Sequence, residues 1–198
     1  MARDAPRGTK LQIIEAALAT LRTEGHAGAS ARAIAREGGF NQALIFYHFG
    51  TVKNLLLAAL DLVSERRASA YATAFREATT ASDLARVVRT IYDQDLEHGY
   101  VKVLAEMVAA GMTDPELGGA VAARIEPWTA MVRDKLEELL ADSPLAALAS
   151  ADDLAFALVA LYFGVDMLGH LEGDRARAES LLDLAGRLSA LADTQRAG

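Results

Sequence analysis

The chain contains no cysteine, which excludes disulfide bonds and thiolate metal sites. Its four histidines form neither a His-x-x-x-His nor a His-Glu-x-x-His pattern, so the sequence predicts no metal site. A glycine-rich nucleotide loop is also lacking, and the spacing of Ser, His and Asp residues indicates no catalytic arrangement. We therefore expect a protein that is not an enzyme and that has no cofactor.

Long apolar runs are absent as well, because no segment approaches the ~20 residues that a membrane span requires. Residues 1–10 are polar and lack the apolar core of a signal peptide. A chain with these features and no cysteine is typical of a reducing compartment. We expect a cytoplasmic location and no membrane partner.

The charge of the 198-residue chain is unevenly distributed. Residues 1–68 carry nine Lys and Arg against six Asp and Glu, whereas residues 69–198 carry eleven against twenty-one. The overall net charge of −7 therefore divides into +3 and −10. This division indicates that only the N-terminal segment meets nucleic-acid phosphates, although chance variation of surface charge would look the same.

Apolar residues make up 52% of the chain and recur at helical spacing, with no useful strand-like alternation. We predict an all-α fold of about nine helices. The first helix is expected from Thr9, which with Gln12 fits a capping box, to Gly25. Asp114 is placed to cap a later helix, in which Pro127 should introduce a kink or a break. The helices of the second part are expected over about 82–99, 100–110, 115–141, 150–173 and from 174 onward.

Residues 30–57 have the organisation of a helix-turn-helix. Ser30 is placed to cap a short helix that Gly38 or Gly39 can end by taking a positive φ. Asn41 is placed to cap a second short helix, which is expected over about 41–48. In such a motif the second helix enters the major groove of DNA.

Over residues 10–60 the chain resembles the TetR family of bacterial transcriptional regulators. Residues 30–35 resemble the second helix of that family, residues 38–41 its turn, residues 44–49 its recognition helix and residues 51–56 the start of its fourth helix. The resemblance implies a homodimer that forms through a four-helix bundle of the last two helices of each subunit. It also implies a small-molecule pocket within residues 75–170, whose occupation releases the DNA.

The resemblance predicts a helix-turn-helix domain over residues 1–50, a linking helix over about 51–73, and a ligand-binding and dimerisation domain over 74–198. The expected function is a ligand-responsive transcriptional repressor, released from a palindromic operator by a small apolar or amphipathic effector. The alternative is a helical ligand-binding or adaptor protein in which the helix-turn-helix domain serves only for packing and recognises no DNA sequence.

The recognition helix offers candidates for reading bases. Gln42 could donate to and accept from adenine in bidentate fashion, while Ala43 and Leu44 could contact thymine methyl groups. Asn41 could also read a base, although a structural role as the helix cap is the alternative.

Candidates for phosphate contacts lie at three helix starts and ends. Phe46 stands where the family commonly has tyrosine, and the family's lysine usually falls at Val52, one residue before Lys53. Because of these departures, we expect Tyr47, His48 and Lys53 to make the phosphate contacts. The alternative for Tyr47 and His48 is packing within the helix-turn-helix domain. The phosphate candidates are Ser30, Arg32, Tyr47, His48 and Lys53.

The expected effector pocket should be apolar with a few polar groups. Trp128, which directly follows Pro127, is the residue most expected to border a cavity. Asp166 and His170 are four residues apart and could pair on one helix face, or could lie at a surface or a dimer interface. Ordinary core packing is the alternative for each apolar candidate. The candidates are Tyr92, Met107, Trp128, Met131, Phe156, Tyr162, Phe163, Asp166, Met167 and His170.

Overall fold

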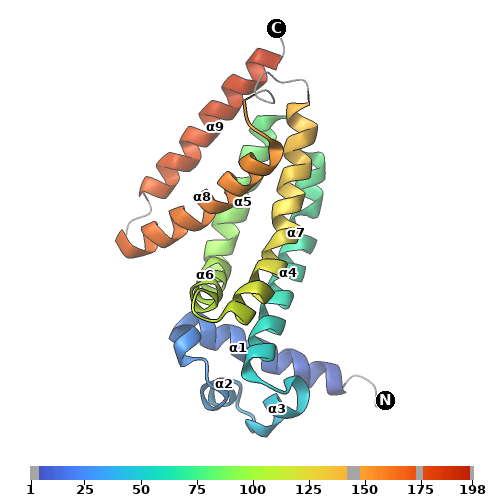
Figure 1. Cartoon of the computed structure of the whole chain (residues 1–198), viewed down its shortest axis with the longest axis vertical. Helices are drawn as coiled ribbons and strands as arrows, with labels where there is room; N and C mark the ends of the chain where they lie inside the picture. Colours follow the sequence, from blue (N-terminus) through green and yellow to red (C-terminus); the bar gives the residue numbers. More distant parts are fainter. Residues whose placement is uncertain (1–4, 142–147, 173–175, 197–198) are drawn as a thin grey trace. The chain divides into compact units, whose positions relative to one another are not determined.

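The computed structural model describes residues 5–141, 148–172 and 176–196. These residues form nine helices and no strand, which confirms the predicted all-α class (Figure 1). The predicted helix boundary at 173–174 lies outside the described residues. The helices are α1 (Ala5–Gly28), α2 (Ala31–Gly38), α3 (Ala43–Phe49), α4 (Val52–Glu77), α5 (Ala81–His98), α6 (Tyr100–Gly111), α7 (Pro115–Leu140), α8 (Ala151–Glu172) and α9 (Ala176–Arg196).

Helix α1 begins earlier than predicted, so the expected capping box at Thr9 and Gln12 is wrong. Pro6 lies in the first turn, where the missing N–H of proline leaves no intrahelical bond unmade. Gln12 instead donates from Nε2 to the carbonyl oxygen of Gly38, at 3.2 Å. The helix was predicted to end at Gly25, whose φ is 69°; it is interrupted there but continues for one more turn to Gly28.

Helices α7 and α8 are both capped at their starts, and the cap of α7 was predicted. Oδ1 of Asp114 accepts hydrogen bonds from the N–H groups of Glu116 and Leu117, both at 3.1 Å. The hydroxyl of Ser150 accepts from the N–H of Asp153 at 3.1 Å. Helix α7 continues through Pro127 to Leu140, so no break occurs there.

Helix α5 begins at Ala81 because Thr80, ahead of the predicted start, is its cap. The Thr80 hydroxyl accepts from the N–H of Asp83, and the Asp83 carboxylate accepts from the N–H of Thr80, at 3.0 and 3.1 Å. Asp193 of α9 accepts from the N–H groups of Ala81 and Ser82, at 2.9 and 3.0 Å. The carboxylates thus satisfy N–H groups that a helix start leaves unpaired, and one of them ties α5 to α9.

The chain divides by packing into two compact units. The first unit comprises the residues up to 67 together with 102–124, and the second comprises 68–101 together with the residues from 125 onward. Within the first unit α1 packs against α2, and within the second α9 packs against α5 and α8. The division by function that was predicted for residues 1–50 and 74–198 stays a prediction.

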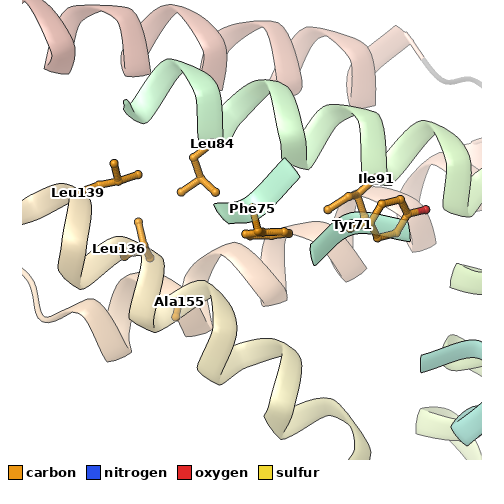
Figure 2. Packing of buried hydrophobic residues seen from close by; sticks show 7 residues of the cluster. All are labelled: Tyr71, Phe75, Leu84, Ile91, Leu136, Leu139 and Ala155. Carbon is orange, nitrogen blue, oxygen red and sulfur yellow. The ribbon is translucent and has the colours of Figure 1, made fainter. Parts of the chain in front are cut away.

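The core of the second unit is aromatic and aliphatic. Figure 2 shows seven buried side chains of this cluster, which come from α4, α5, α7 and α8. Burying one large apolar side chain typically stabilises a fold by about 1.5–3 kcal/mol. The seven residues, which we call the body cluster, are Tyr71, Phe75, Leu84, Ile91, Leu136, Leu139 and Ala155.

In the part of the chain that the structure describes, no single helix is both long and apolar enough to cross a membrane. Helices α3 and α4 meet that criterion only as a pair, with a bend of 69° between them.

The capping box of α5 predicts a pH-dependent stability. Hydrogen bonds from Thr80, and then from the backbone of Thr79, lower the pKa of Asp83 to about 2 from 3.8. A carboxylate with a lowered pKa stabilises the fold above its unfolded pKa and loses that contribution as the pH falls toward its folded pKa. We expect Asp83→Asn to lower the melting temperature by a few degrees at pH 7, and the difference to shrink between about pH 4 and 2.

Thermal unfolding followed by circular dichroism measures this difference. Asp93→Asn is the matched control, because Asp93 is exposed on the same helix and lies away from its start. A difference between wild type and Asp83→Asn that stays constant down to pH 2 contradicts the assignment.

Candidate nucleic-acid interface

Helix α2 is capped at both ends by the residues that the sequence indicated. The Ser30 hydroxyl accepts a hydrogen bond from the N–H of Ala33 at 3.2 Å. Gly39 adopts the left-handed conformation, with φ 67° and ψ 32°, and its N–H donates to the carbonyl of Ala35. Between these caps the buried Ala33, Ile34 and Ala35 form the face of α2 that packs in the first unit.

Gly38 allows α2 to approach α1 closely. A Cβ atom at this position would lie 2.2 Å from the Phe40 ring and 2.8 Å from Cβ of Ala16 in α1. Real side chains essentially never tolerate such distances, so a glycine is required where the chain turns from α2 toward α3 (Figure 1).

Helix α3 begins at Ala43, two residues after the predicted start. Asn41 nevertheless performs the predicted capping, because its Oδ1 accepts from the N–H of Ala43 at 2.9 Å. Gln42 already has helical angles and makes no capping bond of its own. Ile45 is completely buried and anchors the helix, which Gly50 ends with φ 75°.

Several side chains at and beside α3 are exposed, among them most of those that the sequence offered for reading bases. Gln42 and Ala43 are exposed at the start of the helix, next to the exposed Asn41. The Tyr47 side chain is 81% exposed, and its ring makes an edge contact with His48 at 4.8 Å between centroids. Tyr47 is therefore not a packing residue of the head, whereas Leu44 and His48 are half-buried.

Two of the phosphate candidates have structural partners. Ser30 caps α2, as described above, while Arg32 on the same helix is exposed. The Lys53 ammonium lies 2.9 Å from Asp114 Oδ2 and 2.9 Å from Glu116 Oε2, and the hydrogen bonds to Glu116 and then Asp114 raise its pKa. Sequence reasoning missed both ion pairs, because no local pattern links Lys53 to residues so far away in the chain.

Five of the predicted effector-site residues lie together in the second unit. Trp128, Met131 and Tyr162 pack in half-buried positions against the body cluster. Tyr92 is buried beside Val165, and its ring contacts Tyr162 edge-on at 5.9 Å. The half-buried Phe163 contacts Tyr162 in the same way, at 5.9 Å.

The other predicted effector-site residues are not part of this group. Met107 is completely buried in α6 within the first unit. Phe156 and Met167 are 71% and 50% exposed, so ordinary core packing, the alternative for both, is wrong, while their role in an effector site stays a prediction. Their apolar character matches the exposed leucines along α8 rather than a core. Asp166 is half-buried, and the side chain of His170 lies outside the described residues.

Asp95 is a polar residue of the second unit that sequence reasoning missed. Its side chain is fully buried and accepts a hydrogen bond from the Tyr71 hydroxyl at 3.1 Å, and another from the Tyr162 hydroxyl. The sequence held a signal, because Asp95 continues the apolar stripe that contains Leu84 and Ile91 at helical spacing. A carboxylate within an apolar stripe indicates a buried polar group with dedicated partners.

A groove of about 360 Å³ lies between the end of α4 and the first half of α5. None of the predicted effector-site residues lines it. Its lining residues are Tyr71, Ala74, Glu77, Ala78, Asp83, Arg86, Val87, Thr90 and Ile91. Among the described residues, no group of three or more His, Cys, Asp or Glu side chains is arranged to hold a metal ion.

Comparison with known proteins places the helix-turn-helix in a family. Residues 13–59 match the profile described as bacterial regulatory proteins, tetR family. The match covers the helix-turn-helix and about a quarter of the chain. Over 114 residues the chain is 27% identical to the HTH-type transcriptional repressor AcnR of Corynebacterium glutamicum, a match that spans 58% of this chain and only 56% of AcnR.

Two solved structures show that the TetR likeness in fold extends over most of the chain. A TetR-family regulator from Cytophaga hutchinsonii has a TM-score of 0.76 at 18% identity, covering 92% of this chain and 93% of its own. The regulator FadR from Bacillus subtilis, in complex with stearoyl-CoA, has a TM-score of 0.74 at 13% identity and covers 90% and 96%. These likenesses concern the fold alone.

The capping geometry predicts that Ser30 supports stability. We expect Ser30→Ala to lower the free energy of unfolding by about 1 kcal/mol, because the N–H of Ala33 loses its acceptor. Arg32→Ala is the matched control, since Arg32 is exposed on the same helix, and should change stability little. Urea unfolding measures both, and equal effects of the two substitutions contradict the assignment.

Proposed function

We propose that this protein is a DNA-binding transcriptional regulator of the TetR family, and specifically a repressor that binds a palindromic operator in the cytoplasm. The observation that carries the proposal is the pair of capped helices α2 and α3, which expose Gln42, Ala43 and Tyr47 within the segment that matches the family. The family is regulatory, and we propose no enzymatic activity.

Charge supports this assignment of roles. The N-terminal 68 residues carry a net charge of +3, while the rest of the chain carries −10. Attraction to the DNA backbone is electrostatic and weakens steeply as salt displaces protein cations from phosphates. The acidic residues of 69–198 discourage contacts of DNA with that part of the chain, so binding through the N-terminal 68 residues is favoured.

Gln42→Ala is predicted to relax sequence selectivity. Loss of a bidentate contact to a base costs about 1–3 kcal/mol of discrimination, which is roughly a 5- to 150-fold loss of affinity for the operator. Tyr47→Ala should weaken binding to operator and unrelated duplexes alike, because phosphate contacts carry no sequence information. An operator selected from a random duplex pool, followed by fluorescence anisotropy, measures both effects.

Arg86→Ala is the control for these variants, because it also removes a polar side chain but lies in the second unit. Circular dichroism must show that all variants remain folded. A wild-type protein that selects no sequence contradicts the proposal, and favours a helical ligand-binding or adaptor protein that keeps the head for packing.

Dimerisation through the last two helices is the second part of the proposal. Helices α8 and α9 expose large apolar side chains, although monomeric proteins rarely expose contiguous apolar patches of this kind. A second copy of the chain would cover them and place two heads on a palindrome. The exposed residues are Phe156, Leu161, Met167, Leu168, Leu171, Leu181, Leu184, Leu188 and Leu191.

Leu188→Asp is predicted to dissociate the dimer, because it places a charge within the proposed apolar interface. Operator affinity should then fall by roughly two orders of magnitude, since each monomer binds one half-site alone. Leu11→Asp is the matched control, because Leu11 is a similarly exposed leucine in the first unit. Sedimentation velocity measures the oligomeric state, and a wild-type monomer at micromolar concentration contradicts this part.

We further propose that a small apolar or amphipathic effector binds the second unit beside Trp128, Met131 and Tyr162. These half-buried side chains pack against the body cluster. Moving them to admit a ligand costs less free energy than moving fully buried residues. The hydroxyl of Tyr162 and the buried carboxylate of Asp95 supply the polar groups that such a site uses to orient a ligand. Occupation of this site is proposed to release the operator.

A further inference from the structure

Lys53 links the start of α4 to the start of α7 within the first unit. It follows the recognition helix α3 by only a few residues, and it is the cation closest in sequence to that helix. Its ammonium lies 2.9 Å from one carboxylate oxygen of Asp114 and 2.9 Å from one of Glu116. A predicted phosphate contact is thus already bound to two anionic groups.

The two carboxylates differ in how firmly they are held. Asp114 caps α7 with Oδ1, which accepts from two backbone N–H groups, while its Oδ2 faces Lys53. Glu116 makes the second contact from a side chain that is 85% exposed. Asp114 is therefore a fixed anchor, whereas Glu116 can leave Lys53 with little change elsewhere.

Carboxylate and phosphate oxygens compete for the same donors of a lysine ammonium. An exposed ion pair between side chains contributes little stability, so it can be exchanged for a contact with DNA. The exchange nevertheless subtracts from DNA affinity, because one ion pair must break for each phosphate contact made. The two uncompensated carboxylates would then also face the negatively charged duplex.

We propose that Asp114 and Glu116 form an autoinhibitory clamp, which holds Lys53 in the place of DNA phosphate and lowers DNA affinity. This inference rests on the proposed DNA-binding function. It assigns the start of α7 a role in setting affinity that the helix-turn-helix alone does not reveal. The opposite possibility, that the carboxylates position Lys53 for phosphate, predicts effects of opposite sign.

Two variants test the clamp. Glu116→Gln removes one carboxylate, and Asp114→Asn combined with Glu116→Gln removes both, while asparagine remains a good helix cap. The probe is a fluorescent random-sequence duplex of about 30 base pairs, because its binding reports phosphate contacts without a known operator. Anisotropy titrations of the full-length protein over a sodium chloride series give both the affinity and its salt dependence.

We expect each variant to bind the duplex about two- to fivefold more tightly per head, with the double variant stronger. The slope of log affinity against log salt should become steeper by about 0.9 for each lysine that gains a phosphate contact. Weaker binding by either variant overturns the clamp, and so does a change in affinity without a change in slope.

Asp61→Asn is the matched control. Asp61 forms a second ion pair between α4 and α7, with Arg124 Nε at 2.7 Å, and its loss changes the net charge by the same amount as Glu116→Gln. It does not involve Lys53, so its salt slope should stay at the wild-type value. An equal gain in affinity and slope for Asp61→Asn would show a general effect of charge, and would overturn the proposal.

Lys53→Gln tests whether the effect of the carboxylates depends on the Lys53 ammonium. In a Lys53→Gln background, Glu116→Gln should no longer increase affinity, because the effect passes through the ammonium. A gain that persists without Lys53 overturns the clamp. If the wild type binds the duplex and no variant changes that binding, the clamp is wrong but the proposed function is not contradicted. If the wild type shows no salt-dependent binding of the duplex, the proposed function is contradicted as well.

Discussion

The close approach of α2 to α1 at Gly38 is the constraint on which the candidate DNA interface depends. A Cβ atom there would meet the Phe40 ring and the Ala16 side chain, so no other residue allows this packing. Gly39 then turns the chain with a positive φ, and Ile45 seats α3 in the core. Once these contacts are made, the polar start of α3 has no buried position left and must face solvent. The exposed surface at the start of α3 is thus a consequence of how the buried face of the same helix packs.

Local chemistry explains which parts of this arrangement could be predicted from the sequence. Ser30 and Asp114 cap helices through hydrogen bonds to N–H groups three residues away, so their neighbours in sequence are sufficient to predict them. Thr9 fails as a cap because the helix can extend past it toward Pro6. A cap signal shows where a helix can start, and a longer run of helix formers upstream decides whether it does.

Burial against distant parts of the chain could not be predicted in this way. Phe156 and Trp128 both lie at helical spacing among apolar neighbours, yet one is 71% exposed and the other packs on the body cluster. Apolar residues at helical spacing indicate which side chains are buried, but they do not indicate whether the same chain or another molecule buries them. Asp95 shows the converse, because a lone carboxylate in an apolar stripe is tolerated only where Tyr71 and Tyr162 supply hydroxyl groups.

The same limit applies to charge. The formal +3 of the N-terminal segment suggests a surface ready for phosphate, yet several of its cations already have carboxylate partners. Arg36 pairs with Glu24, Arg66 with Glu15, and Lys53 with both carboxylates at the start of α7. Because exposed ion pairs are individually weak, DNA can displace them, and each displacement subtracts from the gain of counterion release. Under the proposed function, the affinity for DNA is then set by the difference between phosphate and carboxylate as partners of these cations. The proposed clamp gives residues of α7, which are far from the motif in sequence, a part in setting it.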